Sequence, residues 1–222
     1  MTSLRRLWVV ATTACLLCFA AVQSSTVAAA RTQALPSASQ VHVDLFRGLA
    51  NVFSRGLDTL GDRLNRQGYT ARVFHHGQWR SVARRIAEGR ARGERHIIVL
   101  IGHSLGANAV LLLARELERS HVPIALVVTY DATDPRQVPR NVAHIVNFFQ
   151  HNGFGTPVVG VPGFQGRLEN IDLTADRSLS HTTIVQSPRL HDEVIARIVQ
   201  IVNEDMAGKV QPARSQGHRP RR

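Results

Sequence analysis

The chain has 222 residues, of which 27 are Lys or Arg and 16 are Asp or Glu, so its formal net charge at pH 7 is +11. A chain of this length predicts one domain with a hydrophobic core of its own. The sequence contains no metal-ligand spacing, phosphate-binding loop, dinucleotide fingerprint or nucleic-acid-binding motif, and we therefore expect no metal, no cofactor and no nucleic-acid partner.

Residues 1–30 have the pattern of a signal peptide. Arg5 and Arg6 precede an apolar run at residues 7–22, and small residues follow. This run of 16 residues is shorter than the roughly 20 that a membrane-spanning helix needs. We expect cleavage near Arg31 and a secreted or periplasmic mature protein, with an uncleaved membrane anchor as the alternative. Both cysteines lie in this segment, so the mature chain would have neither a disulfide nor a thiol nucleophile.

The rest of the chain divides into an N-terminal segment at residues 31–40, one domain at residues 41–205 and a basic tail at residues 206–222. The tail carries five positive charges and no acidic residue, and it is rich in Gly, Pro, Ser and Gln. We expect the tail to be disordered and to keep the protein soluble. Weak contact of the tail with anionic surfaces is the alternative.

In the first half of the domain, short apolar runs alternate with amphipathic ones. A strand is predicted at residues 41–46, followed by a loop and then a helix at residues 57–66. A second strand at 69–74 and a second helix at 81–92 lead to an almost unbroken run of Ile, Val and Leu at 96–101. Such continuous apolarity is typical of a strand that is covered on both faces.

The second half of the domain continues the alternation. Strands are expected at residues 122–130, 142–149 and 168–173, and helices at residues 107–117 and 188–203. Between two of these strands, residues 150–166 are rich in Gly and Pro and predict a loop or a short hairpin. The whole pattern predicts an α/β fold with a mostly parallel, twisted sheet and helices on both faces.

The motif Gly102-His103-Ser104-Leu105-Gly106 joins the strand at 96–101 to the helix at 107–117. A strand that turns sharply into a helix strains the central residue, and residues two positions away must be small for strand and helix to approach. Ser104 would then project from the backbone, beside the free N–H groups at the beginning of the helix. This context predicts that Ser104 is a nucleophile.

The stretch from Ile97 to Val110 resembles the nucleophile elbow of the α/β-hydrolase superfamily, in the GHSLG form common among lipases and esterases. The resemblance extends through the predicted order of strands and helices, from Val41 to about Asn203. It implies a minimal α/β-hydrolase fold, because the 165 residues of the domain leave no room for a cap domain. It also implies that the partners of the serine follow in the order acid and then histidine.

The acid is expected directly after the strand that follows the elbow helix. Asp131 stands at the end of that strand, where ligand-facing residues gather in α/β sheets. Asp134 lies three residues further on, before Pro135, and could equally begin a turn. Lipases of the superfamily that place their acid here have a similar Asp-x-x-x-Pro pattern, so the resemblance favours Asp131. Later acids, at 172 and 176, are weaker alternatives.

His181 is the candidate base, because it lies between the last strand and the last helix, where the superfamily carries its catalytic histidine. Other histidines fit less well. His144 lies inside a predicted strand and is expected to be structural, and His191 is expected on the surface beside the last helix.

The resemblance implies an oxyanion hole built from two backbone N–H groups. One belongs to Leu105, the residue after the nucleophile, and the other to the loop after the first strand. Many relatives have His-Gly in that loop, whereas this chain has Arg47-Gly48, so Leu49 is expected to be the second donor. Arg47 is either a solvated charge or a contact for an anionic group of the substrate.

We therefore expect a serine hydrolase that cleaves carboxylic esters through an acyl-enzyme, using Ser104, Asp131 and His181. A thioesterase or an acyltransferase would use the same triad, and a catalytically silent hydrolase-like binding protein is the alternative from another class. The expected substrate is a small-molecule ester, and the expected oligomeric state is a monomer. Phe154 and Phe164, in the Gly- and Pro-rich loop, are the candidate wall of the substrate site.

Overall fold

The structure is a computed structural model that describes residues 40–49, 54–134 and 137–206. The predicted signal peptide, the N-terminal segment and the basic tail lie outside the described residues, apart from one residue at each inner boundary. None of the helices in the described part of the chain is long and apolar enough to cross a membrane.

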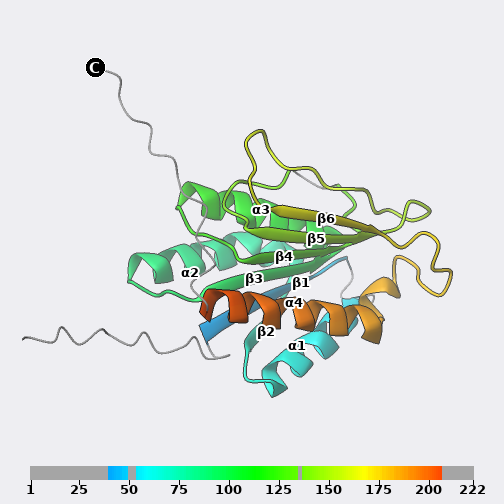
Figure 1. The fold of residues 1–222 in the computed structure, drawn as a ribbon, viewed down its shortest axis with the longest axis horizontal. Helices are drawn as coiled ribbons and strands as arrows, with labels where there is room; N and C mark the ends of the chain where they lie inside the picture. Colours follow the sequence, from blue (N-terminus) through cyan, green and yellow to red (C-terminus); the bar gives the residue numbers. More distant parts are fainter. Residues whose placement is uncertain (1–39, 50–53, 135–136, 207–222) are drawn as a thin grey trace, which may run out of the picture. The chain divides into compact units, whose positions relative to one another are not determined.

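Six parallel strands form one sheet, with the order β2-β1-β3-β4-β5-β6 (Figure 1). In chain order the strands are β1 (Val41–Arg47), β2 (Thr70–His75), β3 (Ile97–His103), β4 (Leu126–Tyr130), β5 (His144–Phe149) and β6 (Arg167–Asp172). Every neighbouring pair is parallel, so the carboxyl ends of all six strands meet at one edge of the sheet. Functional side chains of open α/β sheets gather at that edge.

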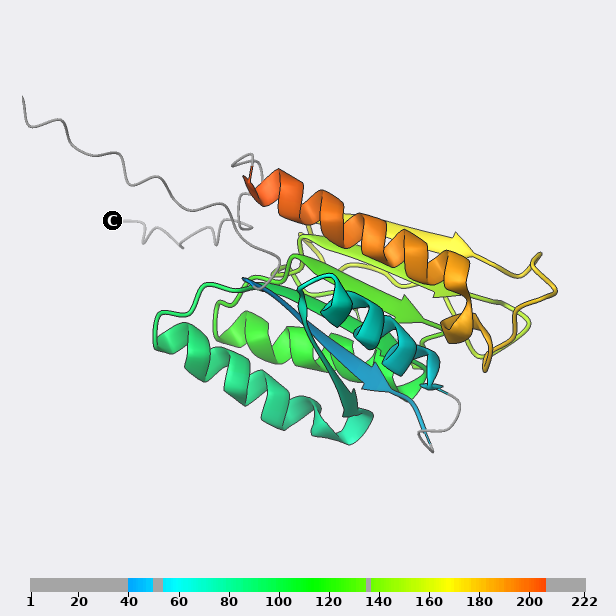
Figure 2. The same cartoon turned by 90° about the horizontal axis from the view of Figure 1, so that it is seen from below.

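Two helices cover each face of the sheet (Figures 1 and 2). One pair is α1 (Gly56–Arg66) and α4 (Pro188–Met206), and the other is α2 (Trp79–Ala91) and α3 (Leu105–Arg119). Alternate residues of β3 divide between the two hydrophobic clusters: Val99 and Ile101 face α1 and α4, whereas Ile98 and Leu100 face α2 and α3. The predicted α/β class, with a mostly parallel sheet covered on both faces, is confirmed, and the described residues include no cap domain.

The connection between β5 and β6 contains no helix. Because the two strands are parallel, residues 150–166 must return from the carboxyl end of β5 to the amino end of β6. Phe154 lies near the beginning of this path and Phe164 near its end, where Phe164 packs beside Gly160 and Gly166 and joins the cluster that faces α2 and α3. The expectation that both phenylalanines border the substrate site is therefore wrong for Phe164.

Candidate active site

Ser104 is the strained residue of a sharp turn between β3 and α3. Its backbone has φ 57° and ψ −122°, a conformation that non-glycine residues rarely adopt. A Cβ on Gly102 would lie 2.3 Å from the carbonyl oxygen of Gly106, and a Cβ on Gly106 would lie 1.9 Å from the carbonyl oxygen of Phe46. Only glycine at both positions lets α3 approach β3 and β1 so closely, and this close approach holds Ser104 at the carboxyl edge of the sheet.

His181 bridges Ser104 and Asp131. Its Nε2 lies 3.1 Å from Ser104 Oγ, and its Nδ1 lies 3.1 Å from Asp131 Oδ2. The carboxylate can only accept, so Nδ1 carries the proton and Nε2 is free to accept from the serine hydroxyl. The structure thus brings together the three side chains that the sequence selected, from the end of β3, the end of β4 and the loop before α4.

Asp131 is fully buried and is held on both carboxylate oxygens. Its Oδ1 accepts a hydrogen bond of 2.9 Å from the backbone N–H of Gln150. A Cβ on Gly155 would lie 2.3 Å from the same oxygen, so the chain after β5 packs directly on the carboxylate. Asp134, the alternative acid, is exposed, and its backbone N–H donates to Asn108 Oδ1.

The loop after β1 lies against the serine. A Cβ on Gly48 would come within 2.9 Å of Ser104 Cβ and 3.4 Å of Ser104 Oγ. The N–H of Gly48 itself donates to Ser54 Oγ at 2.9 Å, and Leu49 follows with an exposed side chain. Leu105 is the first residue of α3, so its N–H has no acceptor within the helix. Leu105 therefore adjoins Ser104 along the chain, and Leu49 directly follows Gly48, the residue that lies against Ser104.

His103 connects the two loops that flank the serine. Its Nε2 lies 2.7 Å from the carbonyl oxygen of His181, and its Nδ1 lies 2.8 Å from Ser54 Oγ. Since a carbonyl only accepts, Nε2–H is the donor, Nδ1 accepts from the Ser54 hydroxyl, and that hydroxyl oxygen accepts from Gly48 N–H. Burial lowers the pKa of His103 to about 4, so the ring is neutral at pH 7, as this arrangement requires.

No role for His103 follows from the sequence alone. Its partners lie 49 and 78 residues away along the chain, so no local pattern marks them. The position of His103 directly before Ser104 in the motif is the signal that the sequence offers.

Arg47, His144 and His191 have structural partners. Arg47 pairs with Asp58 of α1, so its guanidinium is held by the fold. His144 bonds Glu169 at 2.6 Å, as expected for a structural residue. The expectation that His191 lies on the surface is wrong, because it is 2% exposed and its Nε2 lies 2.8 Å from the carbonyl oxygen of Val185. The short 3-10 turn at Ile184–Gln186 brings that carbonyl over the first turn of α4.

Phe154 covers one side of the histidine. Its ring meets the ring of His181 edge-on, with centroids 4.9 Å apart and planes at 69°, while the side chain stays 66% exposed. Phe154 therefore offers an apolar surface beside the reactive atoms. Among the described residues, no group of three or more His, Cys, Asp or Glu side chains could hold a metal ion.

No protein-family model and no curated protein matches the chain. Among solved structures, it is similar to an α/β serine hydrolase without a lid from Xanthomonas campestris, with 15% identity over 74% of this chain and 83% of that one and a TM-score of 0.46. The thioesterase RedJ of the prodiginine pathway in Streptomyces coelicolor has 13% identity over 73% and 92% of the two chains, with a TM-score of 0.44. A cutinase-like protein from Cryptococcus sp. has 13% identity over 75% and 97%, with a TM-score of 0.44.

The hydrogen bonds of His103 predict that it positions His181. We expect His103→Ala to slow the reaction of Ser104 with a fluorophosphonate probe by about a hundredfold, the effect of a small misplacement of reacting groups. His103→Gln keeps a side-chain N–H that can reach the His181 carbonyl, so it should recover part of the rate. His144→Ala, which removes a hydrogen-bonded histidine at the other end of the sheet, should react at the normal rate. Equal rates for the two alanine variants, or no recovery in His103→Gln, would contradict a positioning role.

Proposed function

We propose that the protein is a serine hydrolase that cleaves carboxylic esters through an acyl-enzyme. The observation that carries the proposal is the continuous chain of hydrogen bonds from Ser104 through His181 to Asp131. This chain begins at a strained serine and ends at a buried carboxylate, the arrangement that converts a weak hydroxyl nucleophile into a reactive one.

In the first half of the reaction, Ser104 Oγ attacks the ester carbonyl carbon while His181 Nε2 takes the hydroxyl proton. The negative charge moves to the carbonyl oxygen, where the N–H groups of Leu105 and Leu49 would stabilise it. Asp131 holds the imidazole in the required tautomer and stabilises the imidazolium that forms. When the C–O bond of the ester breaks, His181 returns the proton to the departing alkoxide, which leaves as an alcohol.

In the second half, a water molecule takes the place of the alcohol. His181 removes one proton from the water as its oxygen attacks the acyl carbon, and the same N–H groups stabilise the second oxyanion. The bond to Ser104 Oγ then breaks, and the proton on His181 passes to the serine. Products are the carboxylic acid and the regenerated enzyme.

Small, water-soluble esters are the proposed substrates. Phe154 is exposed beside His181 and offers one apolar wall, and no cap covers the site within the described ranges. Arg47 is paired with Asp58, so it is committed to the fold and offers no free charge to an anionic substrate group.

Thioesters and acyl transfer are the alternatives within the same chemistry, because they need the same triad and differ in the leaving group or acceptor. Comparing the hydrolysis rates of an oxygen ester and a thiol ester with the same acyl chain separates esterase from thioesterase activity. Adding an alcohol as a competing acceptor shows whether the acyl group is transferred to the alcohol or to water. A silent binding protein would leave Ser104 unlabelled by a fluorophosphonate probe.

The hydrogen bonds among Ser104, His181 and Asp131 predict how substitutions at these positions change kcat. Ser104→Ala and His181→Ala should each lower kcat by about 10⁴-fold or more, and the double variant should be no slower, because the two residues act as a unit. Asp131→Asn should lower kcat by about 10⁴-fold, since it disturbs the imidazole tautomer. The matched control Asp134→Asn should keep normal kcat. Steady-state hydrolysis of a p-nitrophenyl ester measures these effects, and a larger loss in Asp134→Asn than in Asp131→Asn would refute the acid assignment.

The position of Phe154 predicts how kcat/KM depends on the length of the acyl chain. Each methylene buried against an apolar wall contributes about 0.8 kcal/mol, or about fourfold in kcat/KM, so kcat/KM should rise over the short acyl chains. In Phe154→Ala this rise should flatten while acetate esters still react. Val159→Ala is the matched control, because Val159 is an exposed apolar residue of the same connection. A length preference that Phe154→Ala leaves unchanged would exclude this wall.

We also propose that the protein is exported and acts as a monomer, on the basis of the N-terminal sequence pattern and the compact single sheet. The mature protein recovered from an exported fraction should then begin near Arg31. A membrane-bound product that still carries residues 1–30 would contradict cleavage.

A further inference from the structure

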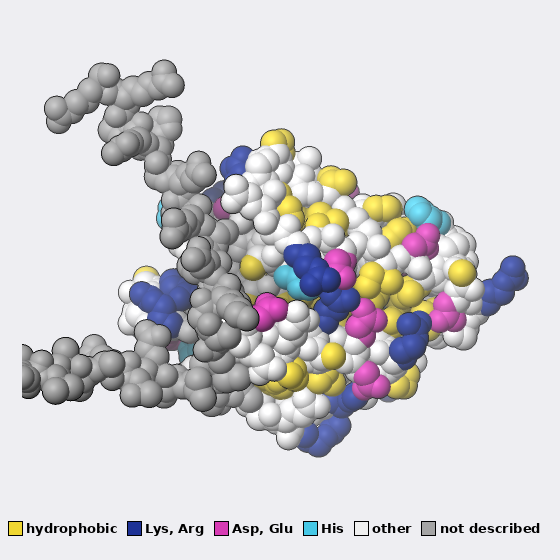
Figure 3. Space-filling model, in the orientation of Figure 1, with side chains coloured by type: hydrophobic (Ala, Val, Ile, Leu, Met, Phe, Trp, Pro, Cys, Tyr) yellow, Lys and Arg dark blue, Asp and Glu magenta, His cyan; other side chains and the backbone are white. Residues whose placement is uncertain are grey.

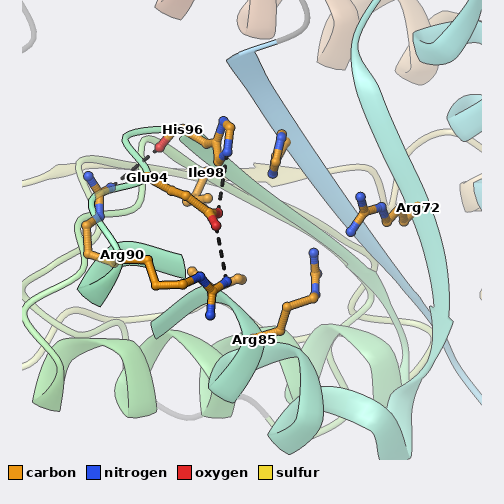
Figure 4. Close-up of a pocket in the computed structure, with 9 residues that line it drawn as sticks. Arg72, Arg85, Arg90, Glu94, His96 and Ile98 are labelled. Carbon is orange, nitrogen blue, oxygen red and sulfur yellow. Dashed lines mark hydrogen bonds and ion pairs between the residues drawn. The ribbon is translucent and has the colours of Figure 1, made fainter. Parts of the chain in front are cut away.

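A second concave site lies on the sheet face covered by α2, far from Ser104. It is a cavity of about 230 Å³ between the amino-terminal parts of β1, β2 and β3 and helix α2 (Figure 4). Its lining residues come from these four elements and the segment before β3: His42, Arg72, Arg85, Ile86, Arg90, Arg92, Glu94, His96 and Ile98. Ile98 stands six positions before Ser104, which places the cavity about 20 Å from the serine along the sheet.

The lining is strongly basic. Four arginines meet one acidic lining residue, Glu94, and one acid in the wall, Asp44. Both acids are already engaged, since Glu94 pairs with Arg92 and His96 and the buried Asp44 pairs with Arg85 at 2.9 Å. At least two positive charges therefore remain unbalanced in the cavity.

The excess positive charge lies around Arg72 and Arg85, because the charges of both act on the single carboxylate of Asp44. Arg85 pairs with Asp44 at 2.9 Å, and Arg72 stands opposite Asp44 in the register of β1 and β2. Burial raises the pKa of Asp44, and the charges of Arg85 and Arg72 both oppose that rise. In the described part of the chain, no carboxylate lies within ion-pair distance of the Arg72 guanidinium. Arg72 reaches in from β2 and Arg85 from α2, and Glu94 and His96 lie on the opposite side (Figure 4). Arg90 lies on that opposite side as well, where it donates to the carbonyl oxygen of His96.

The local electrostatics agree with an excess of positive charge. The pKa of His42 is lowered to about 4 by burial and then by the neighbouring charges of His96, Arg72 and Arg85. The pKa of Arg90 is lowered by burial and by the charge of Arg95. Gathering like charges in a half-buried cavity is unfavourable, and a bound anion would relieve that repulsion.

The shape of the cavity suits a small anion with a compact substituent. His42 and His96 stack at 3.6 Å with their planes 17° apart, which makes a flat wall, and Ile86 and Ile98 add apolar surface. Guanidinium groups bind tetrahedral oxyanions through paired N–H donors. By contrast, the face seen in Figure 3 mixes basic, acidic and apolar side chains.

We propose that this cavity binds a phosphate-type oxyanion, either free or as the monoester of a small molecule, through Arg72 and Arg85. The site is separate from the triad and does not depend on the proposed esterase activity.

Calorimetric titration of the full chain with sodium phosphate, at an ionic strength held constant with sodium chloride, tests the proposal. We expect one saturable site per chain. Arg72→Gln should raise its Kd by about tenfold or more, the effect of losing a charge-assisted hydrogen bond. Arg85→Lys of α2 keeps a positive charge beside Asp44 without the guanidinium fork and should raise the Kd by less. Arg84→Gln is the matched control, because Arg84 is exposed on the same helix outside the cavity. The Kd of the Arg84→Gln variant for phosphate should stay unchanged, although this variant also loses one positive charge.

A second arm replaces inorganic phosphate with glycerol 3-phosphate. Equal Kd values identify a site for the free anion, and tighter binding of the monoester identifies a site for a phosphorylated small molecule; both outcomes support the proposal. Equal unfolding midpoints in chloride alone establish that the variants fold. No saturable binding by either probe, or an equal loss of affinity in Arg84→Gln, overturns it.

Discussion

The close contact of three backbone segments around Ser104 is the constraint on which the candidate active site depends. Gly102 touches the carbonyl of Gly106, and Gly106 touches the carbonyl of Phe46, so β3, α3 and β1 meet without intervening side chains. The N–H of Ser104 also donates to the carbonyl of Tyr130 at 2.9 Å, which places the serine beside the end of β4. Because Asp131 follows Tyr130 directly, the same contacts bring Ser104 and Asp131 to one edge of the sheet.

The neutral ring of His103 links the two loops that flank Ser104. It donates to the carbonyl of His181 and accepts from Ser54, which in turn accepts from Gly48. The base and the loop after β1 are therefore held by one chain of hydrogen bonds that is buried beneath the serine. A parallel sheet makes this possible, because loops distant in sequence leave it at the same edge.

The two ends of the sheet differ in how far their charged side chains are balanced by partners. At the carboxyl edge, the buried charge of Asp131 is met by hydrogen bonds from His181 and from Gln150. Near the amino ends, the guanidinium groups of Arg72 and Arg85 share the single carboxylate of Asp44. The triad is thus internally satisfied, whereas the basic cavity has unused donors, and this difference is the physical basis for assigning it a ligand.

Hydrophobic periodicity and the spacing of Gly102, Ser104 and Gly106 determined the α/β class, the parallel sheet and the position of the elbow, because these depend on neighbours along the chain. The sequence also selected Asp131 and His181, but the chain of contacts from Ser104 through His181 to Asp131 was an inference from a resemblance until the fold placed His181 3.1 Å from each of the other two. Only the tertiary structure decided the position of Phe164, the burial of His191, the partners of His103 and the gathering of arginines around His42. Each of these depends on segments that come together when strands pair and helices pack, and no local pattern encodes such distances.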